Sequence, residues 1–262
     1  MKYFCAISLG VIVLCALCFL QTRKGLPIAS SGDTNVQEES VEFIKNDTFI
    51  AAVMSPALVR IAANVSSPDG IGINSIKGQV TENETLVFAA NGGMYDVNYK
   101  PIGLCVINGK TVQDVAKIGT EGNFNLKFGN QPTNGIFMID KSHAASIIPS
   151  IQYDNDQTST LYATQSGPLM LLNGGINSNF TQGSNNLNIR NGVGIDNKGN
   201  VVLIMSNALI NFYDFACLFR DRFHCQDALY LDGIVSRTYC PSEGYNMDGS
   251  SFGVITYVIM KK

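Results

Sequence analysis

From residue 41 to the C-terminus, short apolar runs alternate with turn residues at close intervals. Runs of this kind, bounded by Gly, Pro, Asn and Asp, predict β-strands. Asn108 with Gly109 and the segment 197–200 each separate two such runs, which predicts two hairpins with turns at the surface. The predicted strands cover residues 49–54, 57–65, 86–95, 102–110, 135–139, 162–175, 193–206 and 228–233.

One helix is predicted late in the chain. Apolar side chains recur there at steps of three and four residues, while charged side chains fall on the opposite face. The apolar positions are Phe212, Phe215, Ala216, Phe219 and Phe223. Many strands with few helices predict an α+β fold, a single domain of mixed, mainly antiparallel β-sheet with a few packed helices.

The N-terminus has a different pattern, because residues 3–20 are apolar and carry no charge. About 18 to 20 apolar residues can span a bilayer, and a cleaved signal has a shorter apolar region. We predict a signal peptide or signal anchor at 1–22, a flexible linker at 23–41 and the folded domain at 42–262. The protein is therefore expected to be exported, and to be periplasmic, secreted or anchored, with membrane contact through the N-terminal segment only.

Charge and cysteine usage narrow the function classes. The net charge is −3 and the basic residues are scattered, so no basic stripe offers a nucleic-acid surface. Cys105, Cys217, Cys225 and Cys240 lie beyond the apolar segment without zinc-type spacing. They are either buried thiols or include one disulfide.

The first segment with candidate chemistry is Asn91-Gly92-Gly93, followed by Tyr95 and Asp96. Paired glycines let the backbone turn sharply and offer amide groups to an anion or a sugar hydroxyl. The alternative is an ordinary hairpin turn. Residues 99–110 are then the expected strand partner.

Ser166 interrupts two apolar runs, in a second candidate segment. A serine nucleophile needs a base, and His143 and His224 are the only histidines in the chain. Because the segment also lacks the G-x-S-x-G elbow, we place Ser166 among substrate-binding residues, and an acyl-transfer hydrolase is a minor alternative.

Two further segments place charged residues at strand ends. Arg190 and Asn191 precede a predicted strand, and an arginine fork suits phosphate, although a solvated charge is the alternative. Asp232 follows an apolar strand and precedes Gly233 and Ser236. Desolvation raises the pKa of a carboxylate and a nearby cation lowers it, and such opposed effects are typical of catalytic groups. The alternative is an Asp that braces the turn through backbone amides.

In this order, these segments resemble the phosphodiester glycosidase family, that of N-acetylglucosamine-1-phosphodiester alpha-N-acetylglucosaminidase, the uncovering enzyme. NGGMY, RNGVG and LDGIVS stand where the family often has NGGYF or NGGMF, RTAIG and LDGGGS, and the differences look like a bacterial-type branch. The resemblance implies a sugar 1-phosphodiester hydrolase with cleft residues at Asn91, Arg190 and Asp232. Its carriers are residues 91–110, 122–137, 165–171, 190–196 and 215–236.

The chemistry of such a substrate suggests one mechanism. The departing phosphate monoester has a second pKa of about 6, so it needs little protonation, and one carboxylate can suffice. We expect Asp232 to act as nucleophile or base and Arg190 to hold the phosphate. Asp96, Asp227 and Asp248 are alternative carboxylates.

No cofactor is predicted and no residue is assigned as a metal ligand, although a divalent cation such as calcium stays open beside phosphate. The expected partner is a phosphorylated or glycan substrate, such as an N-acetylglucosamine 1-phosphodiester of an exported or cell-envelope glycan. The competing function is a non-catalytic module that binds cell-wall glycan or polysaccharide.

Overall fold

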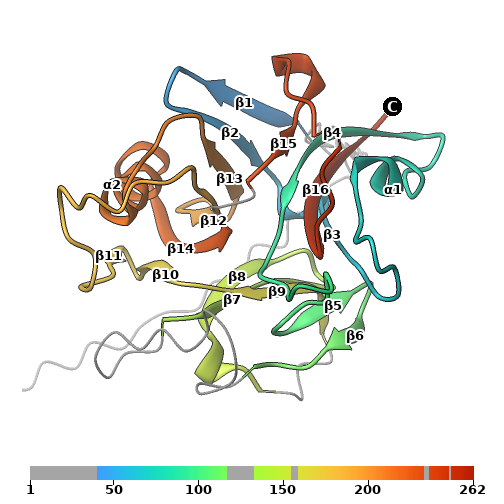
Figure 1. Cartoon of the computed structure of the whole chain (residues 1–262), viewed down its shortest axis with the longest axis horizontal. Coiled ribbons are helices and arrows are strands. Elements are labelled where there is room, and N and C mark those ends of the chain that lie inside the picture. The colour runs from blue at the N-terminus through green and yellow to red at the C-terminus, as the bar shows by residue number, and fades with distance from the viewer. Residues whose placement is uncertain (1–39, 117–132, 155–158, 233–235, 248) are drawn as a thin grey trace, which may run out of the picture. The chain divides into compact units, whose positions relative to one another are not determined.

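The computed structural model describes residues 40–116, 133–154, 159–232, 236–247 and 249–262. They form three β-sheets in which each paired strand is antiparallel to its neighbour, as the pairings between the described strands show. The helices are few and short, so the predicted α+β domain with mainly antiparallel sheet is confirmed. Figure 1 shows the three sheets packed around a common interior, with α1 and α2 on their flanks.

The first sheet has seven strands and carries one of the two predicted hairpins. The segment 197–200 connects two of its strands, as predicted. In sheet order the strands are β1 (Val41–Lys45), β2 (Phe49–Met54), β13 (Val201–Ser206), β12 (Asn191–Asp196), β14 (Cys225–Asp232), β10 (Leu169–Leu172) and β11 (Gly175–Ile176). Val41, the last residue of the predicted linker, is the first residue of β1.

The second and third sheets have four and five strands. The second contains β15 (Thr238–Tyr239), β4 (Glu84–Asn91), β16 (Val254–Lys261) and β3 (Val59–Ala63). The third contains β6 (Lys110–Gln113), β5 (Cys105–Ile107), β9 (Thr160–Ser166), β7 (Gly135–Asp140) and β8 (Ala145–Pro149). The predicted Asn108-Gly109 turn connects β5 to β6, with φ values of 50° and 76° that suit a tight hairpin.

One predicted strand pairing is wrong. β5 pairs with β6 and β9, not with β4, whose neighbours are β15 and β16. Gly93 explains the departure, because a Cβ there would lie 2.4 Å from the Gln165 carbonyl oxygen in β9. The chain therefore leaves β4 by passing closely over β9 into the third sheet instead of turning back in a hairpin.

The main core lies between the sheets and draws on all three, with Leu203 from the first, Phe88 from the second and Phe137 from the third. A second core lies under α2 (Phe212–Cys217), which continues as a π-helical turn at Leu218–Arg222. A Cβ on Gly194 of β12 would lie 2.6 Å from the Phe219 ring, so the glycine lets that ring approach the sheet.

The remaining helices are short. α1 spans Ile73–Lys77, and 3-10 turns cover Pro56–Leu58, Ser150–Gln152 and Pro241–Glu243. Among the described residues, no helix is long and apolar enough to cross a membrane. The predicted signal segment lies outside the described residues.

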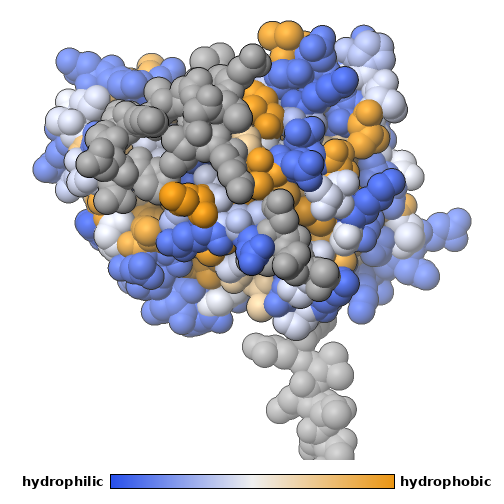
Figure 2. Space-filling view, turned by 90° about the horizontal axis from the view of Figure 1, so that it is seen from below, coloured by the Kyte–Doolittle hydropathy of each residue, from blue (hydrophilic) through white to orange (hydrophobic). Residues whose placement is uncertain are grey.

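The four cysteines of the domain are free thiols, which decides the open choice in favour of thiols over a disulfide. Burial raises the pKa of the Cys105 thiol to about 12. The surface in Figure 2 intersperses hydrophilic residues with small hydrophobic patches. Exposed large apolar side chains such as Val65, Val97 and Leu209 are likewise scattered along the sequence.

Candidate active site

The ends of three strands meet where the first and second sheets touch. Asn91 is the last residue of β4 and Asn191 is the first residue of β12. The Asn191 side-chain amide donates a hydrogen bond of 2.8 Å to the Asn91 carbonyl, and both residues are buried. Asn191 also pairs with Asp232, the last residue of β14. Three segments that are distant in the sequence therefore converge, and we call this place the strand junction.

The Asn91 side chain is only half satisfied in this position. Its Oδ1 accepts a hydrogen bond of 3.2 Å from the Arg237 backbone N–H. Its Nδ2 has no hydrogen-bond partner among the described atoms, although the residue is 0% exposed. A buried donor without an acceptor costs about 1–3 kcal/mol. Such a group is suited to an oxygen atom that a ligand brings.

Two threonines on strands next to β4 also have an unpartnered side-chain atom. Thr238 in β15 and Thr256 in β16 both pair with Ala90, one residue before Asn91, so their side chains lie on the same face of the second sheet. Both are buried, and neither Oγ1 has a hydrogen-bond partner among the described atoms. Because consecutive strand residues point to opposite faces, the two hydroxyls lie on the other face of the second sheet from the Asn91 side chain. The fourth buried side-chain atom in this state is Asn134 Nδ2.

The sequence pattern does not mark Thr238 and Thr256 as candidate site residues. Threonine is a common strand residue, and in the run VITYVIMK it reads as an ordinary β-former. The pattern offered one weak signal, which is a polar residue on the face that alternation assigns to the core.

Ser166 joins the third sheet to the same place. It is the last residue of β9, is fully buried, and donates its hydroxyl proton to the Leu231 carbonyl over 2.6 Å. The hydroxyl is thus used to fix β9 against β14, beside Asp232. This contact gives no support to a serine nucleophile. Ser236 is also buried, one residue before the Arg237 N–H that contacts Asn91.

Arg190 faces away from the Asn91 contact. Its Nε donates to the Ile210 carbonyl at 2.8 Å and its Nη2 donates to the Asn186 carbonyl at 2.9 Å. The guanidinium carbon lies 3.6 Å from the centre of the Phe212 ring. Desolvation lowers the pKa of Arg190, and the Tyr230 side chain acts in the opposite direction. The side chain is 1% exposed.

These contacts give Arg190 a structural role. They tie the segment before β12 to the segment that precedes α2, and the guanidinium also hydrogen-bonds the Tyr230 side chain. Binding of phosphate by Arg190 stays a prediction. Consecutive residues of an extended chain point to opposite faces, which explains why Arg190 and Asn191 contact different parts of the molecule.

The other residues of the NGGMYD segment have local contacts. The Gly92 N–H donates to the Val254 carbonyl at 2.8 Å, which corrects the expectation that this amide is available to a ligand. The Tyr95 ring stacks on Tyr99, with 5.8 Å between ring centres. The carboxylate of Asp96 accepts hydrogen bonds from backbone N–H groups of the following turn, chiefly that of Lys100, and these lower its pKa.

Among the alternative carboxylates, Asp227 accepts a hydrogen bond of 2.9 Å from the Asn173 N–H at a turn. Asp248, Gly233 and the side chain of Asp232 lie outside the described part of the structure. Within that part, no three His, Cys, Asp or Glu side chains are grouped so that they could hold a metal ion.

Comparison with known proteins adds the family. Residues 84–254 match the family model described as phosphodiester glycosidase. The chain belongs to the phosphodiester glycosidase family. The matched region contains β4, β9, β12, β14 and β15, and thus every strand of the junction except β16, which begins at Val254.

The chain is similar to a curated relative and to solved structures. The "Uncharacterized protein YigE" of Escherichia coli (strain K12) is 34% identical over 169 residues, which are 64% of this chain and 63% of that relative. The solved catalytic domain of zebrafish N-acetylglucosamine-1-phosphodiester alpha-N-acetylglucosaminidase, auto-inhibited by its pro-peptide, has a TM-score of 0.56 at 13% identity. That likeness covers 86% of this chain and 83% of the zebrafish chain, and it shows the fold.

A hypothetical protein from Synechocystis has the same fold, with a TM-score of 0.50 at 12% identity over 85% of this chain and 62% of its own.

Proposed function

We propose that this protein hydrolyses a sugar 1-phosphodiester at the glycosidic bond, at the strand junction. The observation that carries the proposal is the convergence of Asn91, Asn191 and Asp232, with the buried Asn91 Nδ2 left without a partner among the described atoms. A folded protein seldom keeps buried donors unpaired, and those that remain require an explanation. A ligand rich in oxygen atoms supplies the missing partners.

The donors suit the charge that develops during the reaction. When the bond between the anomeric carbon and oxygen breaks, the phosphate monoester leaves with the bonding electrons and gains negative charge. Asn91 Nδ2 is assigned to a phosphate oxygen. Donors fixed in place before the reaction stabilise such charge without reorganisation.

Asp232 is assigned as the carboxylate of the reaction. It is the last residue of a buried strand and its backbone pairs with Asn191, so its position is set by the sheet and not by a loop. It acts on the anomeric carbon either directly, as a nucleophile, or through a water molecule from which it removes a proton. Because the leaving phosphate needs little protonation, no second carboxylate is required as a strong acid.

The substrate class comes from the relatives and not from the site alone. The zebrafish enzyme is named for N-acetylglucosamine 1-phosphodiesters, and the same sugar is the first candidate here. Export and a cell-envelope substrate belong to the proposal as well, and they rest on the apolar segment at 3–20.

The test is an assay of the purified protein with N-acetylglucosamine 1-phosphodiesters that differ in the group beyond the phosphate. We expect release of free sugar together with an intact phosphate monoester. Saturable binding without any release would instead establish the non-catalytic glycan-binding module. Neither binding nor release for any sugar 1-phosphodiester would refute both.

A further inference from the structure

A pocket of about 280 Å³ lies beside the segment that precedes β12. It is on the side of Arg190, away from the contact between Asn191 and Asn91. Its walls include the rings of Phe180, Phe212 and Tyr213. Polar groups without charge, from Thr181, Ser184 and two asparagines, complete the lining together with Pro168. Among the described residues that line this pocket, none carries a formal charge.

Two connections link this pocket to the strand junction. Pro168 lies two residues after Ser166, and its carbonyl accepts a hydrogen bond of 3.1 Å from the Tyr230 N–H in β14. Asn186, which lines the pocket, holds the Arg190 guanidinium, and Arg190 precedes Asn191. The pocket therefore adjoins the proposed catalytic site without sharing its residues.

The aromatic side of the pocket is rigid. The Phe180 and Phe212 rings are stacked with 5.0 Å between their centres and 16° between their planes. Phe212 also contacts the Arg190 guanidinium and packs edge-to-face with the Tyr230 ring. A buried cation thus holds Phe212 in place, and the ring cluster needs no rearrangement before it receives a ligand.

We infer that this pocket binds one neutral sugar ring, next to the sugar phosphate in an extended glycan substrate. Its volume of about 280 Å³ lies just below the range for ligand pockets, roughly 300–1,000 Å³, which suits a single ring. The uncharged lining disfavours phosphate or carboxylate groups. Aromatic faces beside amides and hydroxyls fit the apolar C–H face and the hydroxyl groups of a sugar.

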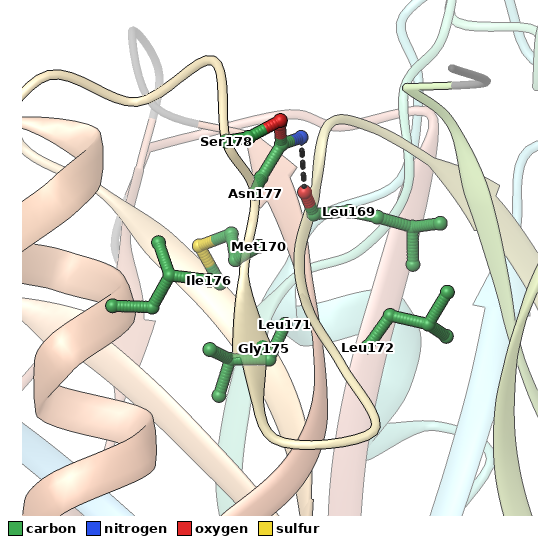
Figure 3. A pocket seen from close by; sticks show the side chains of 8 residues that line it. All are labelled: Leu169, Met170, Leu171, Leu172, Gly175, Ile176, Asn177 and Ser178. Carbon is green, nitrogen blue, oxygen red and sulfur yellow. Dashed lines mark hydrogen bonds between the residues drawn. The ribbon is translucent and has the colours of Figure 1, made fainter.

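A different pocket, shown in Figure 3, is lined by residues between Leu169 and Ser178. It is formed by the β10–β11 hairpin and is lined mainly by aliphatic side chains, including those of Leu169, Met170 and Ile176. The Asn177 amide in this pocket donates to the Leu169 carbonyl at 2.9 Å. It contains no aromatic ring, so it serves as the location of a control.

The inference rests on the proposed function only for the identity of the chain to which the sugar belongs. Binding is therefore measured first without catalysis. The purified protein is mixed with the neutral disaccharide of N-acetylglucosamine, and saturation transfer from protein to sugar is recorded by NMR. We expect binding with a dissociation constant near or below the order of 10 mM.

Ser184→Trp fills the pocket with a large ring and is expected to weaken this binding at least about tenfold. Ser178→Trp places the same side chain at the aliphatic pocket and should leave binding unchanged. The parent chain has no tryptophan, so the fluorescence of the single Trp in each variant shows whether the disaccharide contacts the pocket that holds this Trp. No quenching is expected in Ser184→Trp, because the Trp occupies the sugar pocket, and none in Ser178→Trp, because its Trp lies in the other pocket.

Absence of binding to the parent protein at about 10 mM sugar, or equal binding by Ser184→Trp, overturns the inference. A parent protein that binds the disaccharide but hydrolyses no phosphodiester leaves the pocket assignment standing and rejects the proposed catalysis. If the parent protein both binds the disaccharide and hydrolyses the phosphodiester, Ser184→Trp should raise KM about tenfold for a substrate with an attached neutral sugar. The KM for a single-sugar substrate should not change.

Discussion

Arg190 and Asn191 are consecutive in the sequence, but their surroundings differ. The Arg190 guanidinium is stacked on Phe212 and donates to two backbone carbonyls, so its contacts are internal to the fold. Asn191 instead binds the backbone of Asn91, whose own side-chain amide has a donor without a partner. One face of this strand end is satisfied and stabilises the fold. The face of Asn191 and Asn91 contains a buried donor, Asn91 Nδ2, that has no partner among the described atoms, which costs stability. Buried donors that a fold leaves unpartnered indicate function.

The largest effect is expected at Asp232. Asp232→Asn keeps the shape of the side chain and removes its charge, so it should lower kcat about a thousandfold, which corresponds to about 4 kcal/mol. Steady-state rates on an N-acetylglucosamine 1-phosphodiester measure the loss. Asp227→Asn is the matched control on the same strand, and an equal loss there would move the catalytic role away from Asp232.

Arg190→Lys tests the satisfied face. A lysine cannot reproduce the planar stack on Phe212 or the two separate carbonyl contacts, so the free energy of unfolding should fall by about 2 kcal/mol. Denaturant unfolding measures this change. With a structural role alone, kcat of the folded variant stays close to the parent value.

The same variant separates the two roles considered for Arg190. A hundredfold loss of kcat in a variant that is still folded would assign phosphate binding to the guanidinium, as the sequence predicts.

Thr256→Val tests the effect of a buried hydroxyl that has no hydrogen-bond partner among the described atoms. Valine has the same shape and removes a buried hydroxyl that has no partner, so the free energy of unfolding should rise by about 1 kcal/mol. Turnover should stay close to the parent value, because the Thr256 side chain lies on the other face of the sheet from the Asn91 side chain. Thr160→Val is the control, since the Thr160 hydroxyl interacts with Tyr153. That variant should lose stability and keep its activity.

How much of this contrast the sequence predicts depends on the residue. Alternating apolar runs predict the strands, and Asn108-Gly109 predicts its hairpin, because these signals are local. The partner of β5 is set by the close approach of Gly93 to β9, which no local pattern reveals. Likewise, the acceptors of Arg190 are backbone carbonyls, and a carbonyl has no sequence signature. Asn91, Asn191 and Asp232 were found because their segments match a family pattern.

The smallest effect concerns acid stability. Backbone and side-chain donors hold the pKa of Glu84, Asp96 and Asp140 below their ordinary values of 4.5, 3.8 and 3.8. A lowered pKa in the folded state means that the unfolded chain binds these protons first. The stabilising contribution is therefore present above about pH 4 and is lost as the pH falls through the lower folded values.

Denaturant unfolding at pH 6 and pH 3 measures this loss. Because the three carboxylates lie at the surface, the effect should be modest. Asp96→Asn should reduce the difference between the two pH values without changing turnover at pH 7. A loss of turnover would give Asp96 the place in the active site that its turn contacts do not provide.

The central claim is cleavage of the bond between the anomeric carbon and oxygen at the strand junction. Hydrolysis in water enriched in oxygen-18 tests it directly, because the oxygen of water joins whichever atom is attacked. We predict that the released phosphate monoester shows no isotope shift in its phosphorus NMR signal, since the phosphorus is not attacked. A shifted phosphorus signal would establish attack at phosphorus and contradict the account.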